Sequence, residues 1–306
     1  MLDVIIVNYN STDYLLSCLS SIFNTLDEVS TNITVQDNAS NDNVDRVEET
    51  FPDVKVVRNS RNIGFSKAVN KAIEGGVSPY VAILNPDTLM THGFLGEVLS
   101  YMEMNHDVGV VGPKILNSDG SVQGTARSFP TPLTALFGRT SLLSRLFPGN
   151  RLTGANILTT QCDGETPMEV DWVSGACMVV RRRAIERVGP LDERFFLYWE
   201  DADWCRRMWD SGWKVVYYPQ ASVKHFVGGS SERSRFRSTV EFHKSAYRLF
   251  AKHAKGTQRF AIPLAMGALT LRLFLSLTWN AMHLWSGRSP PIQDIRYNKM
   301  YSTGLL

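Results

Sequence analysis

The sequence predicts an α/β protein with a mostly parallel central sheet, helices flanking that sheet and a helical extension at the C-terminus. Two patterns predict the sheet: short β-branched apolar runs such as Val4–Val7 alternate with apolar residues at helical spacing, and a polar loop follows the runs. A third pattern, the nearly continuous apolar stretch from Phe260 to Trp285, predicts the extension. Strands that alternate with helices pair in parallel through right-handed connections.

Length and composition narrow the class of protein. A chain of 306 residues holds one large domain or two modest ones. Its 32 basic and 30 acidic residues give a net charge of +2, so no global field attracts nucleic acid and we expect no nucleic-acid partner. With 43% hydrophobic residues, 22 glycines and 13 prolines, the composition excludes collagen-like and disordered proteins.

The cysteines and the first residues indicate a compartment. Cys18, Cys162, Cys177 and Cys205 form no close pair, which excludes a zinc knuckle and fits a reducing cytosol. Residues 1–7 lack a basic leader and run straight into a strand pattern, which argues against a signal peptide. We therefore expect a cytoplasmic protein.

The first half of the chain repeats a strand, a polar loop and a helix. In chain order we predict strands at 4–7, 33–36, 54–58 and 80–84, and helices at 14–26, 43–50, 64–74 and after residue 91. Ser11 or Thr12 is placed to cap the first helix.

The second half is less regular. Prolines around an apolar stretch indicate an insertion or flap at 128–168. After it we predict extended segments at 171–180, 213–218 and 222–226, and helices at 183–188 and 200–211. We divide the chain into an α/β domain, residues 1–255, and an apolar helical segment, residues 256–306.

The apolar segment is long enough to span a bilayer, which needs about 20 residues. Arg272 lies near its middle and would cost roughly 2.5–3.5 kcal/mol inside a membrane. An amphipathic anchor in the plane of the membrane tolerates that charge better, and Trp279, Trp285 and the basic flanks suit lipid headgroups. We expect membrane-surface association; the alternatives are a true span and a helix packed on protein.

Polar side chains follow three neighbouring strands of the predicted sheet. They are Asn8 and Asn10, then Asp37 and Asn38, then Asn85 and Asp87. Ligands of open α/β sheets bind beyond the carboxyl ends of the strands, so we expect these groups to form a site. Asp87 on its strand-end turn is suited to a divalent cation that a diphosphate also binds. The alternative is a polar turn in which Asp87 caps the next helix.

Three acids occur within four residues at a predicted helix start: Glu200, Asp201 and Asp203. Acids stabilise helix N-termini, so capping explains part of this cluster. Crowded carboxylates raise the pKa of at least one of them, which makes it a better proton acceptor near neutral pH. The cluster is therefore a candidate for proton transfer.

His225 lies between an extended run and the loop Gly228–Ser231. That loop and the following Arg233, Arg235 and Arg237 are able to wrap phosphates, with His225 adding a nitrogen ligand to the metal. The alternative is a solvated basic loop beside an ordinary polar histidine.

Six motifs occur in order along residues 1–230: Val4–Asn10, Asp37–Ser40, Arg61–Phe65, Leu84–Asp87, Val173–Ala176 and Trp199–Asp203. Together they resemble the family-2 glycosyltransferases, in particular the rhamnosyltransferase-like branch. The resemblance implies a GT-A fold and an inverting transfer of a sugar from a nucleotide-diphospho-sugar. It favours dTDP-rhamnose as the donor, with UDP-sugars second.

Carried over by position, the resemblance implies that Asp37 contacts the nucleobase or ribose. It implies that Asp87 is the metal-binding acid of the family's Asp-x-Asp motif, whose first position here is Asn85. Gly64 and Phe65 would let the backbone approach the nucleotide, although Gly64 suits a helix start equally well.

The same resemblance implies that Asp201 is the general base and that Glu200 is its neighbour on the acceptor side. It implies that His225 completes the ligation of a Mg²⁺ or Mn²⁺ ion. The acceptor-side candidates are Trp172, Ser174, Gly175, Trp199, Asp203 and Trp204. Aromatic faces stack on sugars, but large aromatics on a helix also build cores.

The expected acceptor is a saccharide or a polyprenyl-diphosphate-linked saccharide of cell-surface polysaccharide synthesis, with the enzyme peripheral on the inner face of the membrane. Homo-oligomerisation stays open. One alternative is a nucleotidyltransferase, which needs a basic glycine-rich loop near the first strand where this chain has Asn8-Tyr9-Asn10. Another is a non-catalytic carbohydrate-binding protein.

Overall fold

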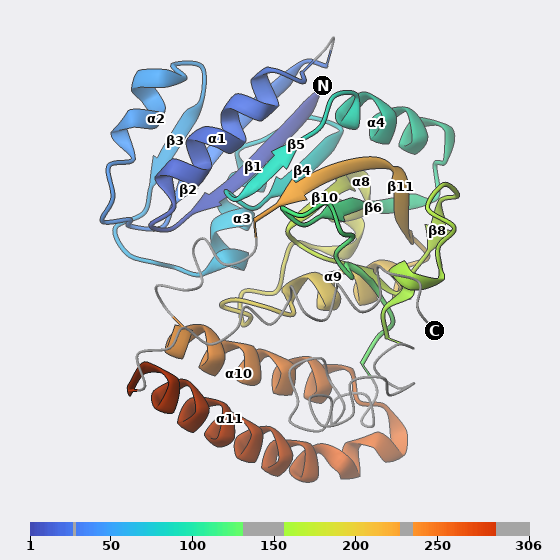
Figure 1. Cartoon of the computed structure of the whole chain (residues 1–306). Coiled ribbons are helices and arrows are strands. Elements are labelled where there is room, and N and C mark those ends of the chain that lie inside the picture. Colours follow the sequence, from blue (N-terminus) through green and yellow to red (C-terminus); the bar gives the residue numbers. More distant parts are fainter. Residues whose placement is uncertain (27–28, 131–155, 227–234, 286–306) are drawn as a thin grey trace.

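The computed structural model describes residues 1–26, 29–130, 156–226 and 235–285. Its main sheet has nine strands, eight of them in the order β3-β2-β1-β4-β10-β6-β11-β5, with β8 paired to β11 (Figure 1). The elements of the first half are β1 Leu2–Asn8, α1 Thr12–Phe23, β2 Thr31–Asp37, α2 Asp45–Thr50, β3 Lys55–Arg58, α3 Phe65–Glu74, β4 Tyr80–Leu84, β5 Thr88–Met90 and α4 Phe94–Met104.

The remaining elements follow in chain order. They are β6 Val108–Leu116, β7 Ala126–Arg127, η1 Leu158–Gln161, β8 Met168–Glu169, β9 Trp172–Val173, β10 Cys177–Arg181, α8 Arg182–Val188, α9 Glu200–Asp210, β11 Lys214–His225, α10 Arg235–His253, η3 Gly256–Ala261 and α11 Ile262–Trp285.

One half of the sheet is parallel, as predicted. Strand β1 pairs in parallel with β2 and β4, and β2 pairs in parallel with β3. The register sets Asn8 beside Asp37 and Ile6 beside Leu84. The carboxyl ends of these strands, and the polar loops that follow them, therefore meet at one edge of the sheet.

The other half is mixed. Strand β10 runs antiparallel to both β4 and β6, whereas β11 runs parallel to β6 and antiparallel to β5. Strand β6 is missing from the sequence prediction, although Val108, Val110 and Val111 form a β-branched run. The predicted segment 171–180 is two strands, because a turn at 174–176 leaves β9 to pair with β7 in a small second sheet.

Helices cover both faces of the main sheet. Helices α1, α2 and α4 pack on one face in a core that contains Leu19 and Phe94. Helices α3, α8 and α9 pack on the other, in a core that contains Trp204 and Tyr217. Strands buried on both faces explain the continuous apolar runs of β1 and β4.

Helices α10 and α11 form a further layer beneath α9 (Figure 1). The helix predicted near the C-terminus is confirmed as α11. Helix α10 was not predicted, and it contains Arg235 and Arg237, which we expected in a phosphate-binding loop. The rest of that loop, Gly228–Ser231 and Arg233, and the middle of the predicted flap, 131–155, lie outside the described residues.

Candidate active site

Side-chain hydrogen bonds join the ends of β1 and β2. Asn8 Nδ2 donates to Asp37 Oδ1 at 3.0 Å. Ser40 donates to the same carboxylate through its backbone N–H at 3.1 Å and its hydroxyl at 2.6 Å. Asn8 Oδ1 is buried and has no hydrogen-bond partner within the described residues. Such an unsatisfied polar atom is typical of a functional site.

The loops after these strands contain non-glycine residues in the left-handed conformation. Asn10 has φ 54° and Ala39 has φ 60°. Bonds between the loops hold them: the Asn10 N–H donates to Ser40 Oγ at 2.9 Å, and the Asn41 N–H donates to Asn10 Oδ1 at 2.7 Å. Backbone strain of this kind costs about 1–3 kcal/mol per residue and clusters at ligand sites.

Asn38 connects β2 to the start of α3. Its Nδ2 donates to the Gly64 carbonyl at 3.2 Å, and its Oδ1 accepts from Asn59 at 3.1 Å. Gly64 has φ 88°, and a Cβ there would lie 2.8 Å from the Phe196 ring and from its carbonyl oxygen. The Phe65 N–H donates to that same oxygen at 2.7 Å. The close approach of Phe196 therefore requires a glycine at position 64 whether or not a nucleotide binds there.

Asp87 and His225 face each other across β5 and β11. His225 Nε2 lies 3.1 Å from Asp87 Oδ1 and 3.4 Å from Asn85 Nδ2. Gln123 orients the imidazole: its amide donates to the His225 carbonyl at 3.0 Å, so its Oε1 accepts from Nδ1–H at 3.1 Å. In the neutral tautomer that donates Nδ1–H to Gln123, the Nε2 lone pair is directed at a carboxylate oxygen, whereas the protonated ring would donate Nε2–H to it.

These groups fit a divalent cation. Asp87 Oδ1 is buried and makes no hydrogen bond within the described residues, and the facing Nε2 of the neutral ring is also an acceptor. Two acceptor atoms this close to each other repel unless one cation binds both of them. No cluster of three or more His, Cys, Asp or Glu able to hold a metal occurs in the part of the chain that the structure describes. Further ligands would come from a diphosphate and water, as is usual for Mg²⁺.

The acid pair begins α9. Tyr198 and Trp199 precede it in left-handed conformations, with φ 67° and 69°. Asp201 Oδ2 accepts the Gly175 N–H at 2.9 Å, and Oδ1 accepts the Ala202 N–H at 2.8 Å. Glu200 is buried, and its Oε2 has no partner among the described residues.

Backbone hydrogen bonds to Asp201 separate the pKa values of the two buried acids. Burial raises the pKa of Asp201, while the Gly175 and Ala202 N–H groups act in the opposite direction. Burial and the neighbouring Asp201 raise the pKa of Glu200 well above its usual range. We infer that Glu200 keeps its proton at a pH where Asp201 is ionised, which makes Asp201 the better proton acceptor.

A short turn joins the acid pair to the cation side. The Asn85 N–H donates to the Ala176 carbonyl at 2.9 Å, one residue from the Gly175 N–H that binds Asp201. Thr88 Oγ1 donates to the same carbonyl at 3.2 Å. Residues 174–176 therefore join Asp201 to the strand-end turn that contains Asp87.

Three aromatic rings pack together beside the start of α9, and Trp199 and Phe242 are partly exposed. The Trp172 and Trp199 ring centroids are 5.8 Å apart, and Phe242 of α10 lies 5.4 Å from Trp199. The Arg127 guanidinium lies 5.2 Å from the Trp172 ring centre. Such surfaces are suited to the apolar faces of sugars.

A family described as "Glycosyltransferase like family 2" matches residues 2–244 of this chain. The chain belongs to glycosyltransferase family 2. Among the curated relatives of this glycosyltransferase is N-acetylglucosaminyl-diphospho-decaprenol L-rhamnosyltransferase of Mycobacterium tuberculosis H37Rv, which is 31% identical over 288 residues, 90% of this chain and 92% of that protein. Another is dTDP-rhamnosyl transferase RfbF of Shigella flexneri, 22% identical, covering 74% of this chain and 69% of that protein.

Solved structures show the fold. Mannosyltransferase PcManGT from Pyrobaculum calidifontis, in complex with GDP-Man and Mn²⁺, matches with a TM-score of 0.57 at 16% identity, covering 99% of this chain and 86% of that one. The match confirms the expected GT-A type of fold.

Three of the predicted acceptor side chains of this glycosyltransferase lie in its interior. Trp172 is buried in the same core as Trp204. Trp204 is fully buried, and its Nε1 donates to the Gly189 carbonyl. Asp203 is fully buried and pairs with Arg207, Lys252 and His253. None of these three side chains is exposed to an acceptor in this structure. Position 203 follows Asp201 by about half a turn of helix and faces α10.

The sequence prediction missed two residues of this glycosyltransferase's site. Gln123, which orients His225, has no sequence motif that would identify it. Phe242, which packs on Trp199, is part of the unpredicted helix α10. The predicted phosphate-binding loop extends to Arg237, so it overlaps the first turn of α10 and leaves the helix out of the prediction.

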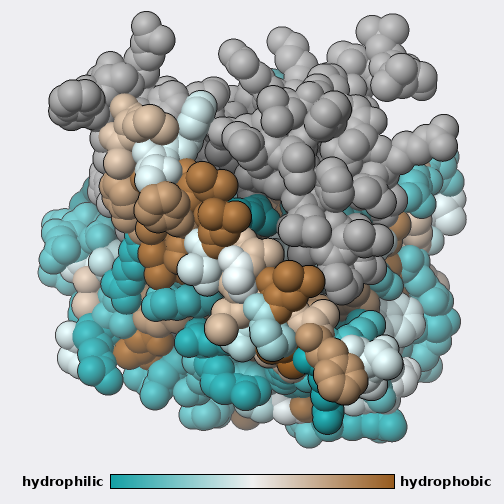
Figure 2. Space-filling view, turned by 90° about the horizontal axis from the view of Figure 1, so that it is seen from below, coloured by the Kyte–Doolittle hydropathy of each residue, from teal (hydrophilic) through white to brown (hydrophobic). Residues whose placement is uncertain are grey.

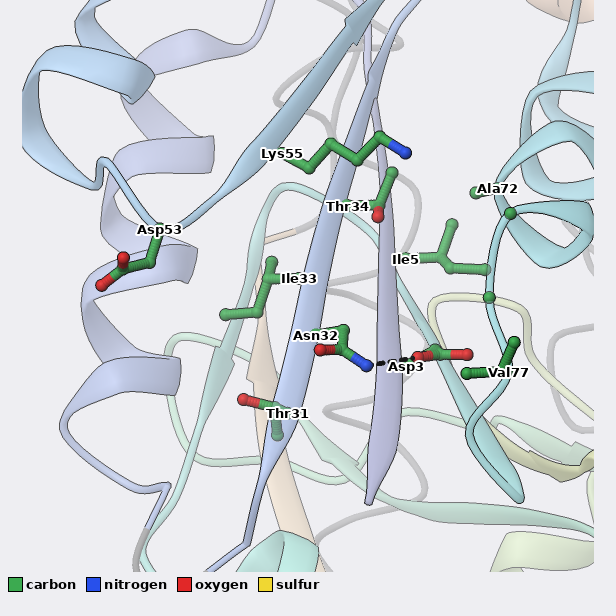
Figure 3. A pocket seen from close by; sticks show the side chains of 12 residues that line it. Asp3, Ile5, Thr31, Asn32, Ile33, Thr34, Asp53, Lys55, Ala72 and Val77 are labelled. Atoms are coloured by element: carbon green, nitrogen blue, oxygen red, sulfur yellow. Dashed lines mark hydrogen bonds between the residues drawn. The ribbon is translucent and has the colours of Figure 1, made fainter.

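A cavity of about 310 Å³ lies away from these residues, at the amino ends of β1 and β2 (Figure 3). Asp3, on its wall, accepts hydrogen bonds from Asn32 and Ser78 and pairs with Arg182 at 2.7 Å. Its polar groups are thus satisfied by protein. None of the predicted site residues of the glycosyltransferase lines it.

Proposed function

We propose that this glycosyltransferase transfers rhamnose from a nucleotide-diphospho-sugar, with dTDP-rhamnose first and UDP-sugars second, to a lipid-linked saccharide acceptor. The proposal is supported by the names of the relatives: one acts on an N-acetylglucosaminyl-diphospho-decaprenol, and another is a dTDP-rhamnosyl transferase. The match to the former spans 90% of this chain and 92% of that protein.

The observation that carries the proposal is the turn 174–176, which joins Asp201 to Asn85 and Thr88 beside Asp87. A transferase that works by single displacement needs a base and a diphosphate site on opposite sides of one anomeric carbon. The three residues of the turn connect the proposed base, Asp201, to the strand-end segment that contains Asp87.

The donor side would be formed by the ends of β1, β2 and β4. Asn8 and Asp37 would bind the nucleoside, and Asp87 and His225 would hold Mg²⁺ or Mn²⁺ at the diphosphate. A divalent cation at this position offsets the negative charge that grows on the leaving diphosphate. Gln123 keeps the His225 ring oriented for that ligation.

On the acceptor side, Asp201 takes the proton of the attacking hydroxyl. The new bond forms on the face of the sugar opposite the diphosphate, so the anomeric configuration inverts. Protonated Glu200 places no second negative charge beside the base. The partly exposed rings of Trp199 and Phe242 would face the acceptor sugar, and buried Trp172 packs against Trp199.

A lipid-linked acceptor agrees with the outer face of α11. Among the described residues, the segment Gly256–Met282 is long and apolar enough to cross a membrane. Figure 2, seen from the side of α11, shows apolar side chains gathered in a band. The exposed apolar residues of this segment are Phe260, Leu264, Met266, Leu271, Phe274, Leu275 and Met282.

Two polar residues of α11, Arg272 and Asn280, face α10. The Arg272 guanidinium lies 5.8 Å from the Phe242 ring centre, and Asn280 Nδ2 donates to Thr239 Oγ1 at 3.3 Å. The charge that argued against a membrane therefore points to α10. We propose that α11 lies in the plane of the membrane on its cytoplasmic face, with its apolar side in lipid.

The test is a transfer assay with the full chain. The donors are dTDP-rhamnose, UDP-glucose and GDP-mannose, the acceptor is a synthetic N-acetylglucosaminyl-diphospho-polyprenol, and NMR gives the anomeric configuration of the product. Transfer of rhamnose with inversion supports the proposal. Transfer from no donor overturns it, and so does formation of a nucleotide sugar from a nucleoside triphosphate and a sugar 1-phosphate, which marks a nucleotidyltransferase.

A further inference from the structure

We propose that α10 positions the catalytic base, and that Lys252 and His253 do so by holding Asp203, two residues after Asp201. This inference rests on the proposed role of Asp201. It assigns a function in the reaction to a helix at the edge of the region that the family description matches.

Asp203 is the centre of a buried charge cluster. Its carboxylate is fully buried and accepts from Arg207 Nε at 2.9 Å, one turn further along α9. The last turn of α10 supplies two more partners, Lys252 Nζ at 2.7 Å and His253 Nε2 at 2.8 Å. Lys252 also contacts Asp192 at 2.7 Å. One ammonium group thus bridges residues on both sides of the acid pair.

Helix α10 also holds the segment that enters α9. Ser245 Oγ donates to the Leu197 carbonyl at 2.9 Å. The Phe242 ring lies 5.8 Å from that of Tyr198 and 5.4 Å from that of Trp199. Both aromatic residues have positive φ, and such a conformation persists only where the surroundings enforce it. Helix α10 supplies part of those surroundings.

The contacts therefore bracket Glu200 and Asp201. The segment before the pair is fixed by Ser245 and Phe242, and the first turn after it is fixed by Lys252 and His253. The Asp201 carboxylate reaches the Gly175 N–H at 2.9 Å only while this turn keeps its orientation. Small displacements of a catalytic group reduce rates strongly, because the reacting atoms must be aligned.

Charge balance alone does not require α10. Arg207 already offers Asp203 a partner within α9. Lys252 and His253 on another helix add geometric constraint, because each contact fixes the carboxylate in one more direction. This distinguishes positioning from mere neutralisation of a buried acid.

The experiment compares two lysines of α10. Lys252→Met removes the bridge, while the control Lys244→Met removes a lysine that is 53% exposed and pairs with Glu241 of the same helix. With vesicle-bound acceptor, we expect Lys252→Met to lower kcat at least tenfold, with the donor KM within twofold of wild type. We expect Lys244→Met to change neither value, and Lys252→Arg to recover most of the activity.

The pH profile separates positioning from loss of folded enzyme. The charged or titratable groups that act on Asp201 are Glu200 and Arg127. If the turn shifts and the Gly175 bond weakens, the acid limb of kcat moves to higher pH in Lys252→Met. A smaller folded fraction lowers the rate at every pH and leaves the limb in place, and that result overturns the proposal.

A second variant guards against misfolding. His253→Leu keeps Lys252 and removes only the imidazole, and it should also lower kcat and move the limb. If wild type transfers sugar and both variants keep its kcat and its limb, this proposal fails while the proposed function stands. If wild type transfers no sugar from any donor, the proposed function itself fails.

Discussion

Asp201 Oδ2 accepts the backbone N–H of Gly175 at 2.9 Å. This bond connects the first turn of α9 to the turn between β9 and β10, and through the Ala176 carbonyl to the end of β4. A backbone donor also stabilises the ionised carboxylate and limits the rise in its pKa that burial causes. The same contact thus fixes the position of the Asp201 carboxylate and favours its ionised form.

Asp201→Asn should bind the donor and fail to transfer it. The amide keeps the shape of the side chain but cannot accept a proton, so we expect kcat to fall by about 10²–10⁴-fold. Donor affinity, measured by calorimetry, should stay within threefold. The matched control is Asp210→Asn, an exposed acid at the other end of α9. Wild-type turnover by Asp201→Asn would remove the base assignment.

The acid limb of kcat/KM should lie above the range of an ordinary aspartate, whose pKa is about 3.9. Burial raises the pKa of Asp201, and a base is active only when ionised, so the rate falls as pH drops through that raised value. A limb at or below pH ~4 contradicts the assignment.

Glu200→Gln should keep most of the activity. Burial and Asp201 raise the pKa of Glu200 well above its usual range, so the residue is protonated while Asp201 works, and glutamine resembles that form. We expect less than a tenfold loss of kcat and an acid limb close to that of wild type. A loss as large as that of Asp201→Asn would instead show that the ionised form of Glu200 is needed.

Removal of the imidazole at 225 should abolish cation-dependent stabilisation by nucleotide. A ligand at 100 times its Kd adds about 2.7 kcal/mol to the free energy of unfolding, which a thermal shift detects. We expect dTDP with Mn²⁺ to stabilise wild type more than dTDP alone, and His225→Asn to lose that difference. His106→Asn, an exposed histidine, is the control. An undiminished Mn²⁺ effect in His225→Asn rules out ligation by this residue.

Gly64→Ala should destabilise the protein more than Gly189→Ala. The two glycines have almost the same backbone conformation, with φ and ψ of 88° and 167° at Gly64 and 87° and 166° at Gly189. At Gly189 nothing lies within 4 Å of an added Cβ, so only backbone strain of about 1–3 kcal/mol applies. At Gly64 the methyl group also meets Phe196 at 2.8 Å. Equal losses in urea unfolding would show that Phe196 moves freely.

The double substitution Leu271→Glu and Phe274→Glu should release the protein from vesicles. Both side chains are exposed on α11, and glutamates there oppose insertion into anionic lipid. We expect loss of co-sedimentation with vesicles that contain phosphatidylglycerol. Val77→Glu, which replaces an exposed apolar residue outside α11, should have no effect. Unchanged sedimentation of the double variant would exclude this face as the membrane contact.

The parallel half of the fold and its strand-end residues were predictable, because repeated strand, loop and helix patterns fix which ends meet. The register that sets Asn8 beside Asp37 confirms this reasoning. Strand β6 was overlooked, and with it the mixed half of the sheet. Neither the pairing of Asp203 with Lys252 nor the support of His225 by Gln123 follows from local patterns, since both join residues at least 49 apart in sequence.

If α11 lies on the membrane as proposed, the order of the three lowest helices would limit which acceptors reach Asp201. Helix α10 lies between α9, which carries Asp201, and α11, whose outer side is apolar. Packed helix axes are about 8–10 Å apart, so two steps raise the base roughly 16–20 Å above the lipid-facing helix. With α11 resting on a bilayer, the stacked helices would hold Asp201 at a fixed height above the lipid. A hydroxyl held close to the headgroups would stay out of reach, whereas one carried outward on a diphosphate and a first sugar would come level with the carboxylate.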